Sequence, residues 1–144
     1  MGKEIVFIDC IWIGLLCTIS YADWKEKRIP NKLLLGVAVC AAVQMFFLGK
    51  EEIMLRFAGM GSSVFVFFLI LIAAPGAFGG GDVKLSAVNG LYLGVVPWMR
   101  SFGIAVITAT IYIVYKMCRM QKMRGEEIAF GPFLCIGAII SFFS

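Results

Sequence analysis

The chain has 144 residues, of which 61% are hydrophobic, and its mean hydropathy is +0.95. An average soluble domain is only about 45–50% apolar, and a water-soluble globule of this size cannot bury so much apolar surface. The 13 basic and 9 acidic residues fall in short clusters between long uncharged runs. This composition indicates a membrane protein and excludes a secreted disulfide scaffold, a disordered tail and a nucleic-acid-binding domain.

The apolar runs predict how often the chain crosses a membrane, since a spanning helix needs about 20 apolar residues. The runs are residues 5–22, 33–48, 57–81, 85–99, 101–115 and 128–144. The fourth and fifth are short, so Lys84, Arg100 and Lys116 are expected to extend toward the headgroups. We predict an all-α, polytopic membrane bundle of about six transmembrane helices, built as a single domain over residues 1–144. The turn expected at residues 97–101 is very short, so five spans with one long broken helix are the alternative.

Basic residues in the loops predict the orientation of the chain in the membrane. With six spans, one side holds four of the 13 basic residues and the other side nine. The nine are Lys25, Lys27, Arg28, Lys32, Lys84, Lys116, Arg119, Lys122 and Arg124. The first, third and fifth loops are therefore expected in the cytoplasm, with both chain ends outside. The first run lacks a strongly basic start and a small-residue cleavage site, and is not expected to be a removable signal peptide.

Histidine is absent, and the five cysteines form no CxxC pair. Zinc sites built from Cys and His, and nucleophile systems that use a histidine base, are therefore not expected. The cysteines are expected to act as small apolar residues. We predict no metal and no cofactor, which leaves carboxylates as the groups for acid and base chemistry.

Two aspartates differ from the other acidic residues in their position along the chain. Asp23 closes the first span and Asp82 opens the fourth, which places both at the predicted cytoplasmic edge of the membrane. An ionisable residue at the edge of a span is a functional candidate. The remaining acids are expected to be solvated or to favour helix N-termini, and Asp9 lies near the outer headgroups. Asp23 and Asp82 are thus a candidate facing pair.

A glycine run at residues 79–81 directly precedes Asp82. Glycine permits a close backbone approach, and unpaired backbone groups at membrane depth need protein or water as partners. The run is therefore expected to line a wet pocket, while Ser86 and Asn89 continue one helix face from Asp82 into the bundle interior. An N-terminal cap is the simpler role for Asp82, but it leaves Asp23 and the polar face unexplained.

Three segments in chain order resemble the motifs of the type IV prepilin peptidases, which are membrane aspartyl proteases of the GxGD kind. The motif residues are Asp23, Arg28, Pro30 and Asn31; Gly79, Gly80, Gly81, Asp82 and Lys84; and, within the FGPFL segment, Gly131 and Pro132. A single GxGD match is weak evidence. Three matches in the same order, on six expected spans, are specific evidence for the resemblance. Together they extend over nearly the whole chain.

The resemblance implies an aspartic endopeptidase with Asp23 and Asp82 as its catalytic pair. One carboxylate would activate water while the other, protonated, would polarise the scissile carbonyl; either aspartate can take either role. The glycines would admit the substrate backbone, and Arg28, Pro30 and Asn31 would shape the first loop. Lys84 would either hydrogen-bond near the pair or reach the headgroups. Pro132 would begin the last helix and form a wall of the site.

The substrate that the resemblance implies is a prepilin or pseudopilin precursor with a short basic leader, a glycine before the cut and an apolar helix in the membrane. Cleavage would occur at the cytoplasmic face of a bacterial or archaeal cytoplasmic membrane, with lipid as the other partner. The chain begins with its first span and lacks CxxC, so it is similar to the short Tad or Flp-type peptidases. N-methyltransferase activity is therefore not expected.

Two other classes of protein are compatible with the spans. A small transporter would bind a cation or substrate near Asp82 and Asn89 at a broken helix, although such carriers usually break helices in both halves. A catalytically silent scaffold for pilus assembly would carry the same helices without cleaving anything.

Overall fold

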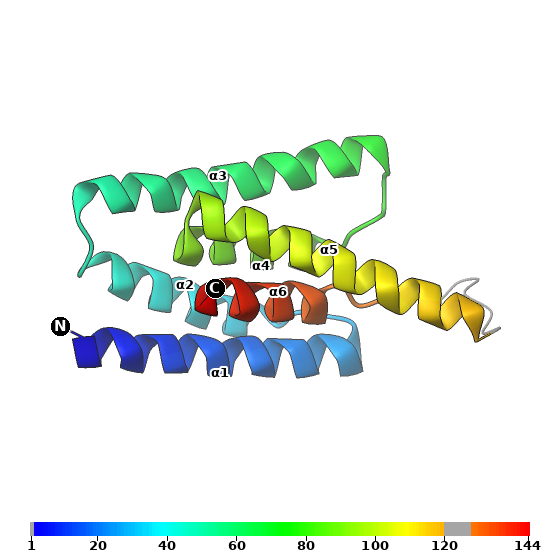
Figure 1. Ribbon diagram of the computed structural model, residues 1–144, viewed down its shortest axis with the longest axis horizontal. Coiled ribbons are helices and arrows are strands. Elements are labelled where there is room, and N and C mark those ends of the chain that lie inside the picture. The colour runs from blue at the N-terminus through cyan, green and yellow to red at the C-terminus, as the bar shows by residue number, and fades with distance from the viewer. Residues whose placement is uncertain (1, 120–127) are drawn as a thin grey trace.

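A computed structural model describes residues 2–119 and 128–144. It contains six helices, and no strand occurs in this part of the chain (Figure 1). The helices are α1 (Gly2–Glu26), α2 (Asn31–Met45), α3 (Lys50–Ala73), α4 (Gly80–Leu93), α5 (Val95–Cys118) and α6 (Gly131–Phe143). The predicted all-α bundle is confirmed. Lys122 and Arg124, which the sequence placed in the last loop, lie outside the described residues.

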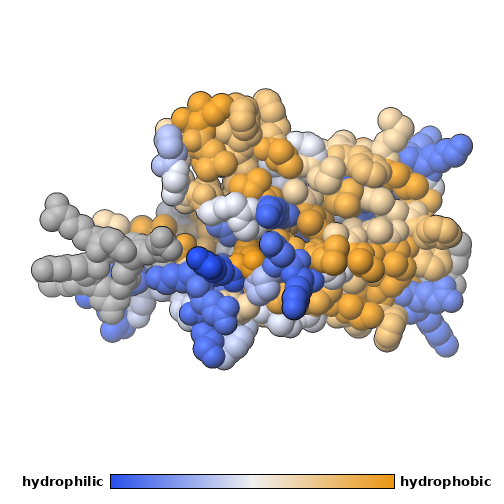
Figure 2. All heavy atoms as spheres, turned by 180° about the vertical axis from the view of Figure 1, so that it is seen from behind, coloured by the Kyte–Doolittle hydropathy of each residue, from blue (hydrophilic) through white to orange (hydrophobic). Residues whose placement is uncertain are grey.

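The surface of the bundle is apolar, as a lipid environment requires. Helices α1, α3 and α5 are long and apolar enough to cross a membrane, while α2 and α6 are apolar but shorter. Large apolar side chains such as Phe7, Phe65 and Ile107 are more than half exposed, and apolar residues cover much of the face in Figure 2. Soluble proteins rarely expose apolar surface on this scale. The chain is a membrane protein.

Helix α4 lies at the centre of the bundle, in contact with α2, α3, α5 and α6. Its residues Ser86 and Asn89 are buried, which confirms that this polar face points inward. The Ser86 hydroxyl oxygen accepts hydrogen bonds from the Ser63 hydroxyl at 2.8 Å and from Trp98 Nε1 at 3.0 Å. Ser86 therefore joins α3, α4 and α5 through hydrogen bonds within the bundle.

The break between the fourth and fifth helices is at Gly94, so the turn predicted at residues 97–101 is wrong. Gly94 has a φ of 87°, a conformation that glycine adopts readily and other residues rarely do. Pro97 instead lies in the first turn of α5, where a missing N–H costs no helical hydrogen bond. The expected third, fourth and sixth spans are likewise shifted, because α3 ends at Ala73, α4 ends at Leu93 and α6 begins at Gly131.

Helices α3 and α4 cross with their backbones in direct contact. A Cβ atom added to Gly59 would lie 2.7 Å from the Gly94 carbonyl carbon and would overlap the Gly90 carbonyl oxygen. A Cβ atom on Gly90 would lie 2.8 Å from the Gly59 carbonyl carbon. Small residues permit this approach between membrane helices. The crossing holds α4, and with it Asp82, at a set position in the bundle.

Replacing Gly59 by alanine is expected to destabilise the protein by about 1–3 kcal/mol, because the added methyl group forces two rigid backbones apart. Gly61→Ala is the matched control on the same helix, since no atom lies within 4 Å of its Cβ position. Thermal unfolding in detergent micelles measures the difference. Equal unfolding temperatures for the two variants would contradict the close crossing.

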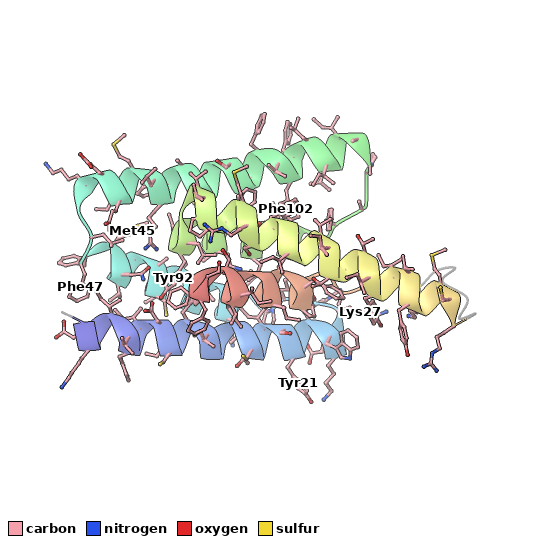
Figure 3. All side chains as sticks on the ribbon, in the orientation of Figure 1. Tyr21, Lys27, Met45, Phe47, Tyr92 and Phe102 are labelled. Atoms are coloured by element: carbon pink, nitrogen blue, oxygen red, sulfur yellow. The ribbon has the colours of Figure 1, made fainter. Side chains whose placement is uncertain are left out.

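A polar network joins α1, α2, α3 and α4 at the end of the bundle away from Asp23. Asp9 Oδ1 accepts hydrogen bonds from the Tyr92 hydroxyl and, at 3.3 Å, from Gln44 Nε2. Arg56 Nη1 donates to Gln44 Oε1 at 2.7 Å. Asp9, which the sequence placed near headgroups, is thus bonded to its own bundle. Figure 3 shows Tyr92 and Lys27 toward opposite ends of the molecule.

Candidate active site

Asp23 and Asp82 line the same cavity, which has a volume of about 680 Å³. Asp23 lies in the last turn of α1 and Asp82 in the first turn of α4. Since the two helices place these ends at the same end of the bundle, residues far apart in the sequence meet there. The loop from α3 to α4 descends beside α5 at this end (Figure 1). Residues 76–79 of this loop complete one side of the cavity.

Asp23 is held by the N-terminus of α6. The side chain is only 5% exposed, and its Oδ2 accepts a hydrogen bond of 2.9 Å from the Gly131 N–H. The positive end of a helix dipole favours a carboxylate at this position. A Cβ atom on residue 131 would lie 2.9 Å from the Asp23 Cγ and closer still to Oδ2. Only glycine therefore fits here without moving Asp23.

Asp82 is partly buried, and its N–H donates to the Gly79 carbonyl oxygen at 3.2 Å. Gly79 lines the cavity with Asp82, whereas Gly80 and Gly81 do not. A Cβ atom on Gly81 would approach the Ile29 Cβ to 3.3 Å. Within the glycine run, Gly79 thus borders the cavity and Gly81 allows the loop after α1 to pack closely.

Comparison with known proteins identifies the family of the chain. The sequence profile described as the Type IV leader peptidase family matches residues 10–114, a range that includes both aspartates. The chain belongs to the type IV leader peptidase family. A prepilin leader peptidase/N-methyltransferase of Bacillus subtilis (strain 168) is 28% identical over 140 residues, covering 95% of this chain and 55% of its own length. A protein of the same description from Legionella pneumophila is 30% identical over 138 residues, covering 92% and 47%.

The chain spans about half the length of the curated relatives it matches. No solved structure matches it. The family is therefore shown by sequence, and the arrangement of its site rests on the structure described here.

The remaining motif residues of this leader peptidase family member lie around the cavity and not in its wall. Pro30 precedes α2, and its carbonyl oxygen accepts hydrogen bonds from the N–H groups of Leu33 and Leu34 at 3.1 and 3.3 Å. The side chains of Arg28, Asn31 and Lys84 are exposed. In the same loop, Lys27 has a φ of 52° and does line the cavity.

Pro132 was expected to start the last helix and to form a wall of the site. It lies in the first turn of α6, where proline is well tolerated. Its side chain borders a separate hollow between α1 and α6, together with Trp24 and Cys135, and not the cavity of the aspartates. Gly131 alone of this pair contacts Asp23.

Several cavity residues carry no chemical signal that sequence reasoning detects. Phe78 and Phe130 pack with their ring centroids 4.8 Å apart, and both border the cavity. One face of α5, which we call the α5 face, forms a further wall. It consists of Val106, Ala109, Thr110 and Ile113. Apolar residues within an apolar span look alike in sequence, so only the tertiary structure separates these from residues that contact lipid.

Proposed function

We propose that this chain is an aspartic endopeptidase that removes the leader peptide of prepilins at the cytoplasmic face of the membrane. The observation that carries the proposal is the single cavity lined by Asp23 and Asp82. Membership of the type IV leader peptidase family supplies the reaction class, and the relatives named as prepilin leader peptidases supply the substrate class.

Two carboxylates in one cavity suit the hydrolysis of a peptide bond. Neighbouring like charges disfavour the doubly ionised state, so the pair holds one proton between them. The ionised carboxylate takes a proton from water as the water oxygen bonds to the carbonyl carbon, while the protonated carboxyl donates a hydrogen bond to the carbonyl oxygen. The C–N bond then breaks, and the leaving amine takes up the proton that the first carboxylate received from water, which restores the pair. The Gly131 N–H orients Asp23 for this step.

The charge distribution supports the cytoplasmic placement of the cavity. Lys27 lines it, Arg28 lies in the same loop, and Lys25 and Lys32 lie at the helix ends on either side of this loop. Loops rich in Lys and Arg remain in the cytoplasm. In this proposal the chain crosses the membrane several times, and its cavity faces the cytoplasm, where the leaders of the precursors lie.

We propose Flp-like prepilins as the substrates within this class. We also propose that these 144 residues transfer no methyl group, since they contain no CxxC pair. Incubation with a precursor and labelled S-adenosylmethionine measures methyl transfer separately from cleavage. A methylated N-terminus on the mature pilin would contradict the assignment as a peptidase without methyltransferase activity. The assignment as a peptidase would remain intact.

The proposal is tested by incubating the purified protein in detergent micelles with a matching prepilin. Mass spectrometry is expected to show one cut that releases the leader. We predict that EDTA leaves the initial rate unchanged, because the carboxylate pair itself activates the water. An EDTA-sensitive rate that zinc or magnesium restores would contradict the aspartic mechanism.

A further inference from the structure

The α5 face connects the two aspartates with the apolar part of the membrane. Its residues Val106, Ala109, Thr110 and Ile113 recur at the spacing that places side chains on one side of a helix. They line the cavity of Asp23 and Asp82, and they belong to a helix long enough to cross the membrane. The face is thus the wall along which a bound molecule can continue from the cavity into the bilayer.

The α5 face is open and apolar. Val106 is 40% exposed and Thr110 is exposed, whereas the small Ala109 between them is buried. The Thr110 hydroxyl donates to the Val106 carbonyl oxygen at 2.7 Å, so it needs no partner from outside. Helices associate in membranes by packing on small residues of this kind. The face suits an apolar helix and offers nothing specific to a charged one.

The other walls of the cavity are less suited to a membrane-embedded partner. They consist of the end of α1, the loop at residues 76–79, the start of α4 and residues 128–130, and they include Asp23, Asp82 and Lys27. The hollow between α1 and α6 is apolar, but neither aspartate lines it. A substrate seated there would not be continuous with the carboxylate pair.

We propose that the apolar segment of the prepilin, on the far side of the cut from its leader, packs as a helix along the α5 face. This inference rests on the proposed function. A precursor with its scissile bond between the aspartates and its apolar segment in the membrane leaves the cavity along this wall. The α5 face then selects precursors by their apolar helix, at a distance from the bond that is cut.

Site-specific photocrosslinking tests this placement. A benzoylphenylalanine is introduced at Thr110 in the Asp82→Asn protein, which is expected to hold the precursor uncut in lipid nanodiscs. The matched control is Ile111, the next residue, which is 63% exposed but does not line the cavity. Ile136, 43% exposed in the hollow between α1 and α6, represents the rival position. The precursor is expected to crosslink at position 110 at least about fivefold more than at 111 or 136.

Competition with unlabelled precursor is expected to remove the crosslink at position 110. Equal crosslinking at 110 and 111, stronger crosslinking at 136, or crosslinks to lipid only at 110 would each overturn the proposal. Cleavage by the unsubstituted enzyme is measured in parallel. Cleavage without a crosslink at 110 refutes the docking surface alone, whereas the absence of cleavage refutes the proposed function.

A kinetic comparison gives a second, independent readout. Thr110→Trp is expected to lower kcat/KM for the full precursor by about tenfold, the effect of an overpacking cost of roughly 1.4 kcal/mol on binding. Ile111→Trp is expected to change it by less than about twofold, as for a side chain directed to lipid. A short peptide that spans the cut but lacks the apolar segment is expected to lose less kcat/KM on Thr110→Trp than the full precursor does, because only the precursor has an apolar helix to pack against position 110. An equal loss with both substrates would mean that the tryptophan blocks the cavity, and would contradict a role in docking.

Discussion

Replacing Asp23 or Asp82 by asparagine is expected to lower the rate of prepilin cleavage by about 10²–10⁴-fold, the usual contribution of a positioned acid or base. Asparagine has nearly the same shape as aspartate, but it can neither take the proton of water nor hold the shared proton. Each substitution alone removes a partner that the other carboxylate needs, so the double variant is expected to be little worse than either single one. Initial rates of leader release, normalised to folded protein, measure the effect.

Asp9→Asn is the matched control for these variants. Asp9 is also an aspartate in α1, but it is bonded to Tyr92 and Gln44 at the other end of the bundle and does not line the cavity. Its replacement is expected to leave the rate per folded molecule within about twofold of the wild type, as for other substitutions away from a site. Wild-type cleavage by the Asp23 or Asp82 variant would remove that residue from the catalytic pair.

Replacing Gly131 by alanine is expected to lower the cleavage rate by about 100-fold, although residue 131 has no side chain that takes part in chemistry. The added Cβ overlaps the carboxylate of Asp23, so either Asp23 or the start of α6 must move. A misplacement of about 1 Å at a catalytic group is enough for a loss of this size. The hydrogen bond from the residue 131 N–H to Asp23 Oδ2 would be lost or lengthened at the same time.

Gly14→Ala and Gly103→Ala separate this effect from a general loss of helix packing. Both glycines lie within helices, and no atom is found within 4 Å of either Cβ position. They are expected to keep wild-type rates. The unfolding temperature of Gly131→Ala is measured alongside its rate, because a loss of activity in a still-folded protein is what displacement of Asp23 requires. Normal cleavage by Gly131→Ala would contradict the proposed role of this contact.

The helix boundaries show which parts of the fold were accessible from sequence. Apolar runs separated by charges gave the all-α bundle, because water and lipid sort these side chains without reference to the rest of the fold. The turn predicted at residues 97–101 is wrong, because Pro97 is compatible with the first turn of α5. The chain reverses at Gly94, whose left-handed backbone adjoins the close contact with Gly59. That contact is between segments distant in sequence.

The motif residues of the candidate site divide into those that the structure brings together and those that it does not. Asp23, Asp82 and Gly131 stood out from the sequence as charges at span edges or as parts of motifs, and the structure places all three at one end of the bundle. Arg28, Asn31 and Lys84 came from the same motifs, yet their side chains are exposed outside the cavity. A motif identifies residues that occur together, but the direction of each side chain depends on the packing of its helix.

The sequence by itself determined that this is a membrane bundle of the type IV leader peptidase family, and it predicted carboxylates as the groups for catalysis. Hydropathy, the absence of histidine and the order of the motifs are local properties, so they can be read without coordinates. Only the tertiary structure decided that Asp9 belongs to a structural network and Asp23 to the cavity, and that the α5 face forms its wall. These assignments depend on contacts between helices. Two residues of the same type, such as Asp9 and Asp23, differ in role only because different residues lie opposite them.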